Sequence, residues 1–382
     1  MFPQRIRSVN VFNVTIHRFA ATLALHILDK SQAADGDRFR PKPGGWAGRA
    51  GFVAAVAAIV LWYVLANKPF RADELSAGVI LAIGALSLNV LVGYTGQISL
   101  GHQAFIGIGA FTTAYVFMHS HQGFYVGLLA GALVGAVQAV ILGLIALRVR
   151  GLYFALVTLA WGFVAENAIF RIVSFTGGGA GARAPRPSGF STDKTYLIMC
   201  VIVLAVILVV DWRLVATKAG RALQALRESP NVASSFGINV RAYTLFAFAV
   251  SGVYAGIAGA LFAARRGNVV AVDFTFADIA LPYLIVTVVG GLRRRGGIVV
   301  FAMLYILGRE YLPDWGSSIS FLKNNAIYVI PALSGVLAIV TLIFQPEGLG
   351  TFTAPIGRWL KGERFHVDLS GGGRAEGVDA RP

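Results

Sequence analysis

Charged residues and cysteine are both scarce in this sequence. Charged residues make up 13% of the 382 residues and hydrophobic residues 56%, whereas an ordinary globular protein carries roughly 25% charged residues. This composition excludes an ordinary soluble domain, and it excludes a disordered chain because so much apolar surface is readily buried. The single cysteine, Cys200, excludes an intrachain disulfide and a cysteine metal cluster.

The motifs of several enzyme classes are also missing. There is no GxxxxGKS/T phosphate loop, so the chain cannot bind ATP in that way. There is no GxSxG elbow and no HExxH motif. The glycine-rich stretch at 176–181 lacks the lysine of a phosphate loop, and His102 has no second histidine or carboxylate at ligand spacing. We therefore predict no catalytic site, no metal site and no cofactor in this chain.

Long apolar runs dominate what the sequence does contain. A membrane-spanning helix needs about 20 mostly apolar residues, and ten runs approach that length. They lie at residues 51–67, 75–93, 103–118, 124–147, 151–170, 195–212, 242–264, 278–292, 296–312 and 326–344. We predict an all-α, polytopic helical membrane protein with about ten transmembrane helices. The transmembrane domain would cover 51–350, between a basic tail at 1–50 and a second tail at 351–382.

The net charge of +15 is distributed as in membrane proteins, not as in nucleic-acid-binding proteins. Of the 33 Lys and Arg residues, 23 fall in one set of alternate segments and ten in the other. The richer set comprises the two tails and residues 148–150, 213–241 and 293–295. Because positive segments mark the cytoplasmic side, we predict that both termini and the 213–241 loop are cytoplasmic. The apolar piece 19–28 is too short to span, and we predict no cleaved signal peptide.

The segment Gly220–Val240 is a polar, helix-forming stretch between two apolar runs. It contains Arg221, Arg227, Glu228 and Gly237. It could be an interfacial helix that lies among lipid headgroups with its arginines on anionic lipid. It could equally be a docking helix for a soluble partner on the cytoplasmic side. The pattern alone does not separate these two interpretations.

A glycine-rich polar stretch, GYTGQISLGHQAF at 93–105, separates the second and third predicted spans. Irregular backbone at membrane depth is tolerated only where protein buries it or where it lines an aqueous cavity, and discontinuous helices of this sort build transporter substrate sites. One interpretation is a solute path. The residues of that path would be Gly93, Gly96, Gln97, Ser99, Gly101 and His102. The alternative is a packed crossover whose Gln and Ser satisfy freed backbone groups.

Glu166 is the only acid that we place well inside a predicted span. Acids inside a membrane are costly and are usually paired or functional. Glu166 lies near the end of its span, however, so a snorkelling or loop-capping role is at least as good an interpretation. The absence of a series of buried acids argues against a proton relay.

Small residues recur every four positions on two predicted spans. Gly127, Gly131 and Gly135 do so on the fourth span, and Gly252 and Gly256 on the seventh. This spacing lets helix backbones approach closely in lipid. We favour packing within one chain over dimerisation for both sets.

Five blocks of the sequence occur in the order and spacing of a known family. They are GYTGQISLGHQAFIGIGAFTTAYV at 93–116, GLYFALVTLAWG at 151–162, the long block 220–263, VVGGLRRRGG at 288–297 and FQPEGLG at 344–350. They resemble the LivM-type permeases of branched-chain amino acid ABC importers, the hydrophobic amino acid transporter family. The resemblance covers about residues 75–350. The sequence departs from it at Arg293–Arg295, where relatives usually have an uncharged turn.

The resemblance implies a permease subunit in a bacterial inner membrane. It would import branched-chain amino acids or related small solutes, with urea, amide or aromatic-acid transport as alternatives within the family. Its partners would be a second permease of similar fold, two ATPase subunits, a periplasmic solute-binding protein and the surrounding membrane lipid. ATP would bind to those ATPase subunits, which supply the phosphate loop that this chain lacks.

The resemblance also gives Gly220–Val240 a role. A coupling helix at about Arg221–Phe236 would dock on the ATPase, and Gly237 would end that helix. The coupling residues implied are Arg221, Arg227, Glu228, Ala233 and Gly237.

Two rival classes stay open at this point. A secondary transporter or channel acting alone would need no ATPase and would usually show buried ionisable groups for ion coupling. A structural membrane subunit without a solute path predicts no water access to Gln97 or Ser99.

Overall fold

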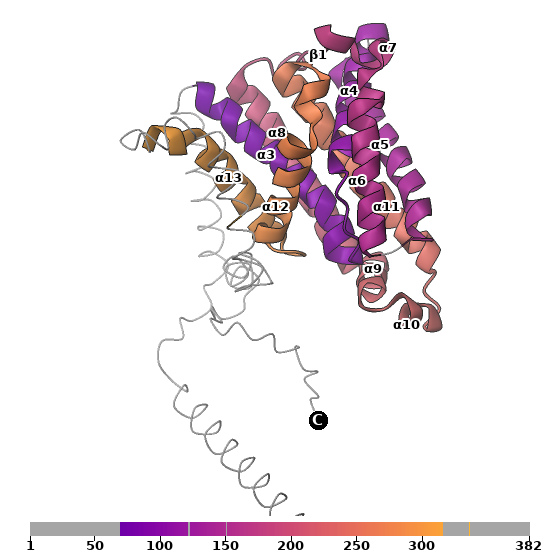
Figure 1. The fold of residues 1–382 in the computed structure, drawn as a ribbon. Helices are drawn as coiled ribbons and strands as arrows, with labels where there is room; N and C mark the ends of the chain where they lie inside the picture. The colour runs from indigo at the N-terminus through magenta and orange to yellow at the C-terminus, as the bar shows by residue number, and fades with distance from the viewer. Residues whose placement is uncertain (1–68, 121–122, 150, 316–335, 337–382) are drawn as a thin grey trace, which may run out of the picture. The chain divides into compact units, whose positions relative to one another are not determined.

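The computed structural model describes residues 69–120, 123–149, 151–315 and 336. The predicted spans 51–67 and 326–344 and the two predicted tails lie outside the described residues, apart from Val336. Every predicted span that falls on the described residues is helical (Figure 1).

Nine helices in the described part of the chain are longer than eight residues. They are α3 (Pro69–Asn89), α4 (His102–Ser120), α5 (Phe124–Ala146), α6 (Leu152–Asn167), α8 (Asp193–Ala216), α9 (Lys218–Glu228), α11 (Val240–Arg266), α12 (Leu281–Gly290) and α13 (Arg295–Trp315). Two of them begin at polar caps that satisfy the first free backbone N–H groups. The Thr192 hydroxyl accepts the N–H of Thr195 before α8, and the Asn239 side chain accepts that of Ala242 before α11.

Shorter elements join these helices. They are η1 (Val90–Thr95), η2 (Ile169–Arg171), α7 (Val173–Thr176), η3 (Gly178–Ala180), β1 (Ala182–Ala184), α10 (Pro230–Ser235), β2 (Gly267–Val269), η4 (Ala271–Phe274) and η5 (Phe276–Ala280). β1 and β2 pair antiparallel, with Arg183 opposite Asn268. The all-α prediction did not include this pairing. It forms because Gly267, the residue after the end of α11, has a positive φ of 73° that turns the chain back toward β1.

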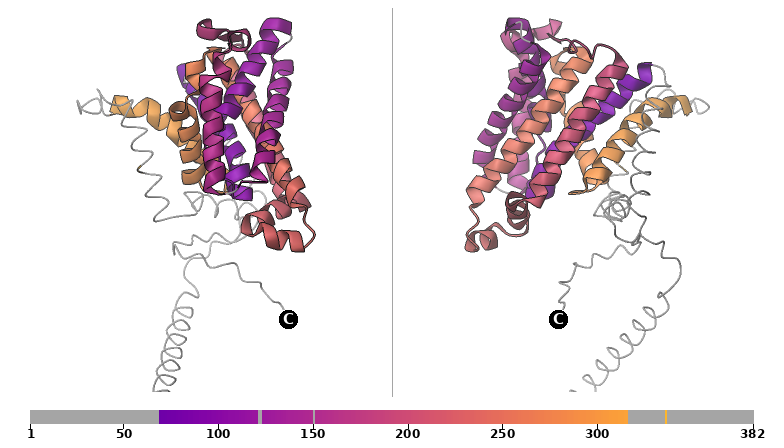
Figure 2. Two further views of the ribbon diagram at one scale, coloured as in Figure 1. Left: turned by 45° about the vertical axis from the view of Figure 1, so that its right-hand side comes forward. Right: turned by 180° about the vertical axis from the view of Figure 1, so that it is seen from behind.

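α4 is the innermost helix of the bundle. Residues 102–114 are all buried, because α5, α6, α11 and β1 surround this helix. α3 is nearly as enclosed, with α8, α11 and α13 packed around it (Figure 2). By contrast, only about a third of α5, α6 and α8 is buried, so their apolar outer faces are suited to lipid.

Five segments among the described residues are long and apolar enough to cross a membrane. They are Ala72–Thr95, Phe124–Ala146, Leu152–Arg171, Asp193–Ala216 and Val240–Arg266. The chain is therefore a multi-pass helical membrane protein. The total of ten spans and the orientation of the termini remain predictions.

The small-residue pattern produces a seam of close backbone contacts between α4, α5 and α11. A Cβ added at Gly135 would lie 2.5 Å from the Gly252 carbonyl oxygen, and one added at Gly109 would lie 2.6 Å from the Gly256 Cα. The preference for packing within one chain is thus confirmed for both sets of glycines.

Candidate functional site

The crossover between α3 and α4 begins where α3 widens into the π-helical turn η1. Gly96 ends that turn with a left-handed φ of 70°, and both its N–H and that of Gln97 donate to the Leu91 carbonyl. Non-glycine residues rarely adopt this conformation. The chain then runs without regular structure to α4, which begins at His102. Gly96 therefore fixes where the discontinuity falls.

The polar side chains of the crossover differ in their exposure and partners. Ser99 and His102 are buried and Gln97 is half-buried. Within the described residues, Gln97 Oε1, Ser99 Oγ and both side-chain polar atoms of Gln103 have no hydrogen-bond partner. A buried polar atom without a partner costs about 1–3 kcal/mol. The packed-crossover alternative required Gln and Ser to satisfy backbone groups, and these two side chains do not do so here.

Gly101 lies against the backbone of α6. Any Cβ there would collide with the Thr158 carbonyl group, and the neighbouring Leu100 N–H donates to the Thr158 hydroxyl at 3.0 Å. The close approach that Gly101 permits is therefore an approach to a neighbouring helix. This contact fixes the crossover to α6.

His102 ties three helices together. Its Nε2 lies 2.7 Å from the Ser87 hydroxyl on α3, and that hydroxyl also bonds the Ser251 carbonyl on α11 at 3.0 Å. The Ser251 hydroxyl donates back to the Ser87 carbonyl at 2.9 Å. This arrangement gives His102 a packing function at the start of α4, and no group of metal-ligating side chains occurs among the described residues.

The prediction of a single coupling helix at Arg221–Phe236 is wrong, because the segment forms two helices, α9 and α10. Ser229 between them is extended, with φ −160° and ψ 111°. The cause is Pro230, whose ring disfavours a helical conformation in the residue before it. Ser229 then caps α10, since its hydroxyl accepts the Val232 N–H.

Gly237 ends α10, as the sequence predicts. Its φ is +77° and its N–H donates to the Ser234 carbonyl at 3.0 Å, while the Ile238 N–H donates to the Ala233 carbonyl at 3.1 Å. These two bonds form a Schellman motif. No atom lies within 4 Å of a Cβ added at Gly237, so backbone conformation alone favours glycine at this position.

The outer face of α9 and α10 combines charge with apolar groups. Arg221 and Glu228 are exposed, whereas Ala233 is 2% exposed and faces the bundle. Val232 and Phe236 are 55% and 81% exposed. These two residues were not among the predicted coupling residues, although an apolar pair four positions apart on a polar segment was a usable signal.

Arg227 joins the two predicted sites. Its guanidinium donates to the Gly93 carbonyl at the crossover, and its side-chain stem lies 3.2 Å from a Cβ added at Gly96. Burial and the neighbouring Arg293 lower the pKa of the Arg227 guanidinium, which stays charged at neutral pH because arginine titrates far above it. The coupling segment and the crossover are therefore in direct contact.

A buried ion pair lies beside this contact. The Asp211 carboxylate on α8 accepts hydrogen bonds from the Tyr94 hydroxyl at 2.6 Å and from the Nε–H of Arg295. The Nη2 group of Arg295 also donates to the Asp211 backbone carbonyl at 3.1 Å. The Asp211 side chain is 1% exposed. It thus corrects the statement that Glu166 is the only acid well inside a span. Glu166 instead caps a loop, because its carboxylate accepts the Phe276 N–H at 3.2 Å.

The arginine turn after α12 is part of the same region. Arg293 has a left-handed φ of 68°, and its N–H donates to the Asn89 side chain at 2.8 Å. Arg295 pairs with Asp211. The departure from the family pattern at Arg293–Arg295 therefore has a structural role in this chain.

A family model described as "Branched-chain amino acid transport system / permease component" matches residues 71–345. The chain belongs to this family. The high-affinity branched-chain amino acid transport system permease protein LivM of Escherichia coli K12 is 30% identical over 332 residues, covering 79% of this chain and 75% of that protein. Its counterpart in Salmonella typhimurium is 31% identical over the same shares.

The name of a more distant relative refers to a different solute. The D-allose transport system permease protein AlsC of Escherichia coli K12 is 27% identical over 197 residues, 50% of this permease and 57% of that protein. No solved structure matches the permease significantly. The likeness to LivM covers more of this chain at higher identity, so this permease is grouped with the branched-chain amino acid systems.

Proposed function

We propose that this permease is one half of the membrane part of an ATP-driven importer for branched-chain amino acids in a bacterial inner membrane. A second permease of similar fold would form the other half. Two ATPase subunits would bind and hydrolyse ATP, and a periplasmic binding protein would deliver the amino acid. The family assignment and the likeness to LivM support this proposal.

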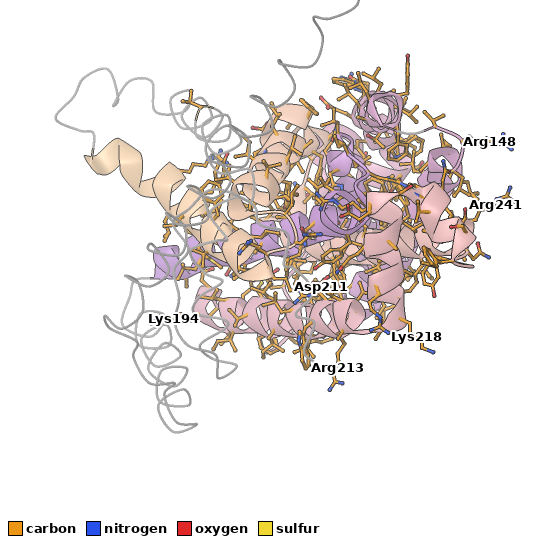
Figure 3. The ribbon with its side chains drawn as sticks, turned by 90° about the horizontal axis from the view of Figure 1, so that it is seen from below. Arg148, Lys194, Asp211, Arg213, Lys218 and Arg241 are labelled. Atoms are coloured by element: carbon orange, nitrogen blue, oxygen red, sulfur yellow. The ribbon has the colours of Figure 1, made fainter. Side chains whose placement is uncertain are left out.

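Charge supports the proposed orientation, in which α9 and α10 face the cytoplasm. Arg148, Arg213, Lys218 and Arg241 lie around the end of the bundle that carries α9 and α10 (Figure 3). A cytoplasmic excess of Lys and Arg is the usual signature of orientation. With this end inside, β1, β2 and the first residues of α3 face the periplasm.

The single observation that carries the coupling proposal is the contact of Arg227 with the crossover. An ATPase subunit seated on the exposed Val232, Phe236 and Glu228 would move α9 and α10 together, since a single extended residue separates them. Arg227 would pass that displacement to Gly93, and thereby to the segment with unpartnered polar atoms. The crossover would then alternate between arrangements that open the path to one side or the other.

The proposed solute path runs beside Gly93–Phe105, with Gln97 and Ser99 facing it. The unpartnered atoms of these two side chains support this proposal, because water or solute in a path would satisfy them. Gly101 and His102 would hold the segment against its neighbouring helices.

Reconstitution of the complete importer in proteoliposomes tests the proposal. We expect labelled leucine to enter only with ATP and with the binding protein present. Arg227→Gln should lower leucine uptake per ATP hydrolysed by about tenfold or more, because a hydrogen bond to a charged group contributes roughly 1.5–3 kcal/mol. Arg241→Gln, an exposed residue at the same end, is the matched control and should behave as the wild type.

Two results would contradict the proposal. Leucine uptake by the permease alone, driven by an ion gradient, would identify a secondary transporter. Unchanged coupling in Arg227→Gln would show that the contact with Gly93 transmits nothing.

A further inference from the structure

A cavity of about 250 Å³ lies between α3, α11, η5, α12 and α13. It is at the opposite end of the bundle from α9 and α10 (Figure 1), and thus far from the crossover. Sites for drug-sized ligands typically measure about 300–1,000 Å³. The cavity is therefore of a size for one small solute.

One part of the cavity wall is aliphatic and rigid. Its aliphatic members are Ile80, Leu81, Ile279 and Ile306. The first three are at most 6% exposed, so the packing of the bundle holds them in place. Such a surface favours an aliphatic group over a polar one.

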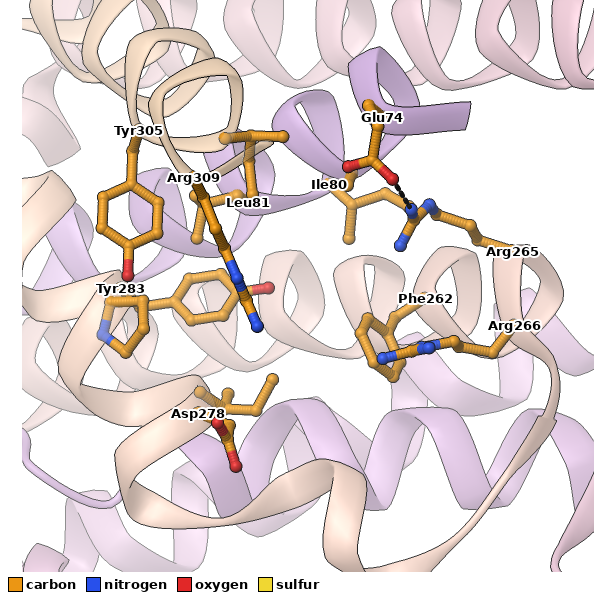
Figure 4. A pocket seen from close by; sticks show the side chains of 14 residues that line it. Glu74, Ile80, Leu81, Phe262, Arg265, Arg266, Asp278, Tyr283, Tyr305 and Arg309 are labelled. Atoms are coloured by element: carbon orange, nitrogen blue, oxygen red, sulfur yellow. Dashed lines mark hydrogen bonds and ion pairs between the residues drawn. The ribbon is translucent and has the colours of Figure 1, made fainter. Parts of the chain in front are cut away.

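Charged side chains of both signs also line the cavity, together with Phe262, Tyr283 and Tyr305. Arg265 is already engaged, because Asp73 accepts from its guanidinium at 2.6 Å and Glu74 at 3.3 Å. Figure 4 shows this arginine directed at Glu74 on one side of the cavity. Three other lining charges, two arginines and one aspartate, take no part in this pair.

These remaining charges come from three different elements. Arg266 on α11 and Arg309 on α13 point toward each other across the cavity (Figure 4). Arg266 is half exposed, and its contact with the Asp273 carboxylate is long, at 3.9 Å. Arg309 makes no ion pair within the described residues. Asp278 on η5 accepts the Thr275 hydroxyl at 2.6 Å and is otherwise exposed.

We propose that this cavity binds one zwitterionic amino acid with an aliphatic side chain. The ligand carboxylate would lie between the guanidinium groups of Arg266 and Arg309, a pairing that gives short, charge-assisted hydrogen bonds. The ammonium group would lie beside Asp278, and the side chain would pack on the aliphatic wall. The inference rests on the proposed function and adds a site for the solute at the mouth of the permease, apart from the crossover.

Protection of an introduced cysteine tests this site directly. Ala77 lines the cavity and is half-buried, so Ala77→Cys is made in the complete importer after Cys200→Ala. Its reaction with a small water-soluble maleimide is followed without the binding protein and without nucleotide. We expect saturating leucine to slow the reaction at least tenfold. Leucinamide, which lacks the carboxylate, and 4-methylpentanoate, which lacks the ammonium group, should need at least tenfold higher concentrations for the same protection.

Two variants and one control assign the charges. Arg309→Gln and Asp278→Asn should each raise the leucine concentration for half-protection at least tenfold, with the rate without leucine unchanged within twofold. An unchanged rate without leucine shows that the cavity wall is intact. If one variant alters this rate, the half-protection concentration of the other variant tests the proposal. Arg183→Cys, exposed on β1 at the same end, should react equally with and without leucine.

The outcomes separate this site from the proposed function. If the thiol introduced by Ala77→Cys is unreactive, or leucine does not protect it, while ATP-dependent leucine uptake persists, the cavity is not a solute site and the importer proposal stands. Equal protection by leucinamide or 4-methylpentanoate would also overturn the inference. If the wild-type importer takes up no leucine, the proposed function fails, whatever the introduced thiol shows.

Discussion

Replacing Asp211 with asparagine should destabilise the helical bundle far more than the same change elsewhere on α8. The variant keeps the shape of the side chain but removes its charge. Arg295 then loses its partner, and Tyr94 keeps only a neutral acceptor. The perturbation therefore isolates the value of one buried carboxylate.

The expected magnitude follows from the burial of the two partners. Breaking a buried ion pair by removing one partner costs about 3–5 kcal/mol. The lower end applies here, because the Arg295 side chain keeps 22% of its surface exposed while Asp211 keeps 1%. With an unfolding entropy of about 2.1 cal/mol/K per residue, a loss of about 3 kcal/mol in a chain of 382 residues corresponds to a fall in Tm of about 4 °C.

The single cysteine of this permease provides the assay. Cys200 is buried on α8, the helix that carries Asp211, so a thiol-reactive fluorogenic dye reports thermal unfolding of the purified protein. Asp193→Asn is the matched control. Asp193 is 30% exposed and pairs with Arg186, which keeps Asp73 as a second partner. A surface pair of this kind contributes about 0–1 kcal/mol.

Equal shifts in Tm for Asp211→Asn and Asp193→Asn would refute this reasoning. A double variant gives a second check. Arg295→Gln alone leaves the Asp211 carboxylate buried without its cation, so combining it with Asp211→Asn removes both charges. The loss of unfolding free energy in the double variant should be smaller than the sum of the losses in the two single variants. The difference should be about 1 kcal/mol or more.

Three further predictions concern coupling and the path. Gly237→Val should reduce leucine uptake per ATP hydrolysed, because the left-handed backbone there costs a non-glycine residue about 1–2 kcal/mol, whereas Gly237→Asn should retain most of it; equal uptake in both would remove this turn from coupling. Glu228→Arg should likewise lower coupled uptake while the permease remains folded in the membrane. Single cysteines at positions 97 and 99, after Cys200→Ala, should react with an impermeant thiol reagent, and trapped ATP should change their reactivity. If neither position reacts in any nucleotide state, this segment is packing and the path lies elsewhere.

The helices of the described region were largely predictable, because local composition identifies membrane helices. A run of about 20 apolar residues can satisfy its backbone in lipid only as a helix. The glycine spacing on α5 and α11 was equally local and correctly predicted close packing. The break at Ser229 was also readable, since Pro230 restricts its neighbour, but the amphipathic pattern concealed it.

Asp211 shows where the reasoning from sequence failed. It lies inside the predicted span 195–212, one residue from the end of that span, and no role was predicted for it. The arginines at 293–295 were interpreted as an orientation signal and as a departure from the family, and not as partners of a buried acid. Pairing them with an acid required knowing that the start of α13 lies beside α8, which depends on how helices far apart in the chain pack.

The sequence by itself determined the helical membrane class of this protein, the helices of the described region and its family, and it singled out two segments as functional candidates. These properties depend on composition and on residues within a few turns of one another. Only the tertiary structure brought Arg227 to Gly93, 134 positions away, and gathered the side chains of α3, α11 and α13 around one cavity. Such contacts arise because whole helices pack by shape and because buried charges must find partners. Neither the packing of whole helices nor the partner of a buried charge can be inferred from the neighbouring residues in the chain.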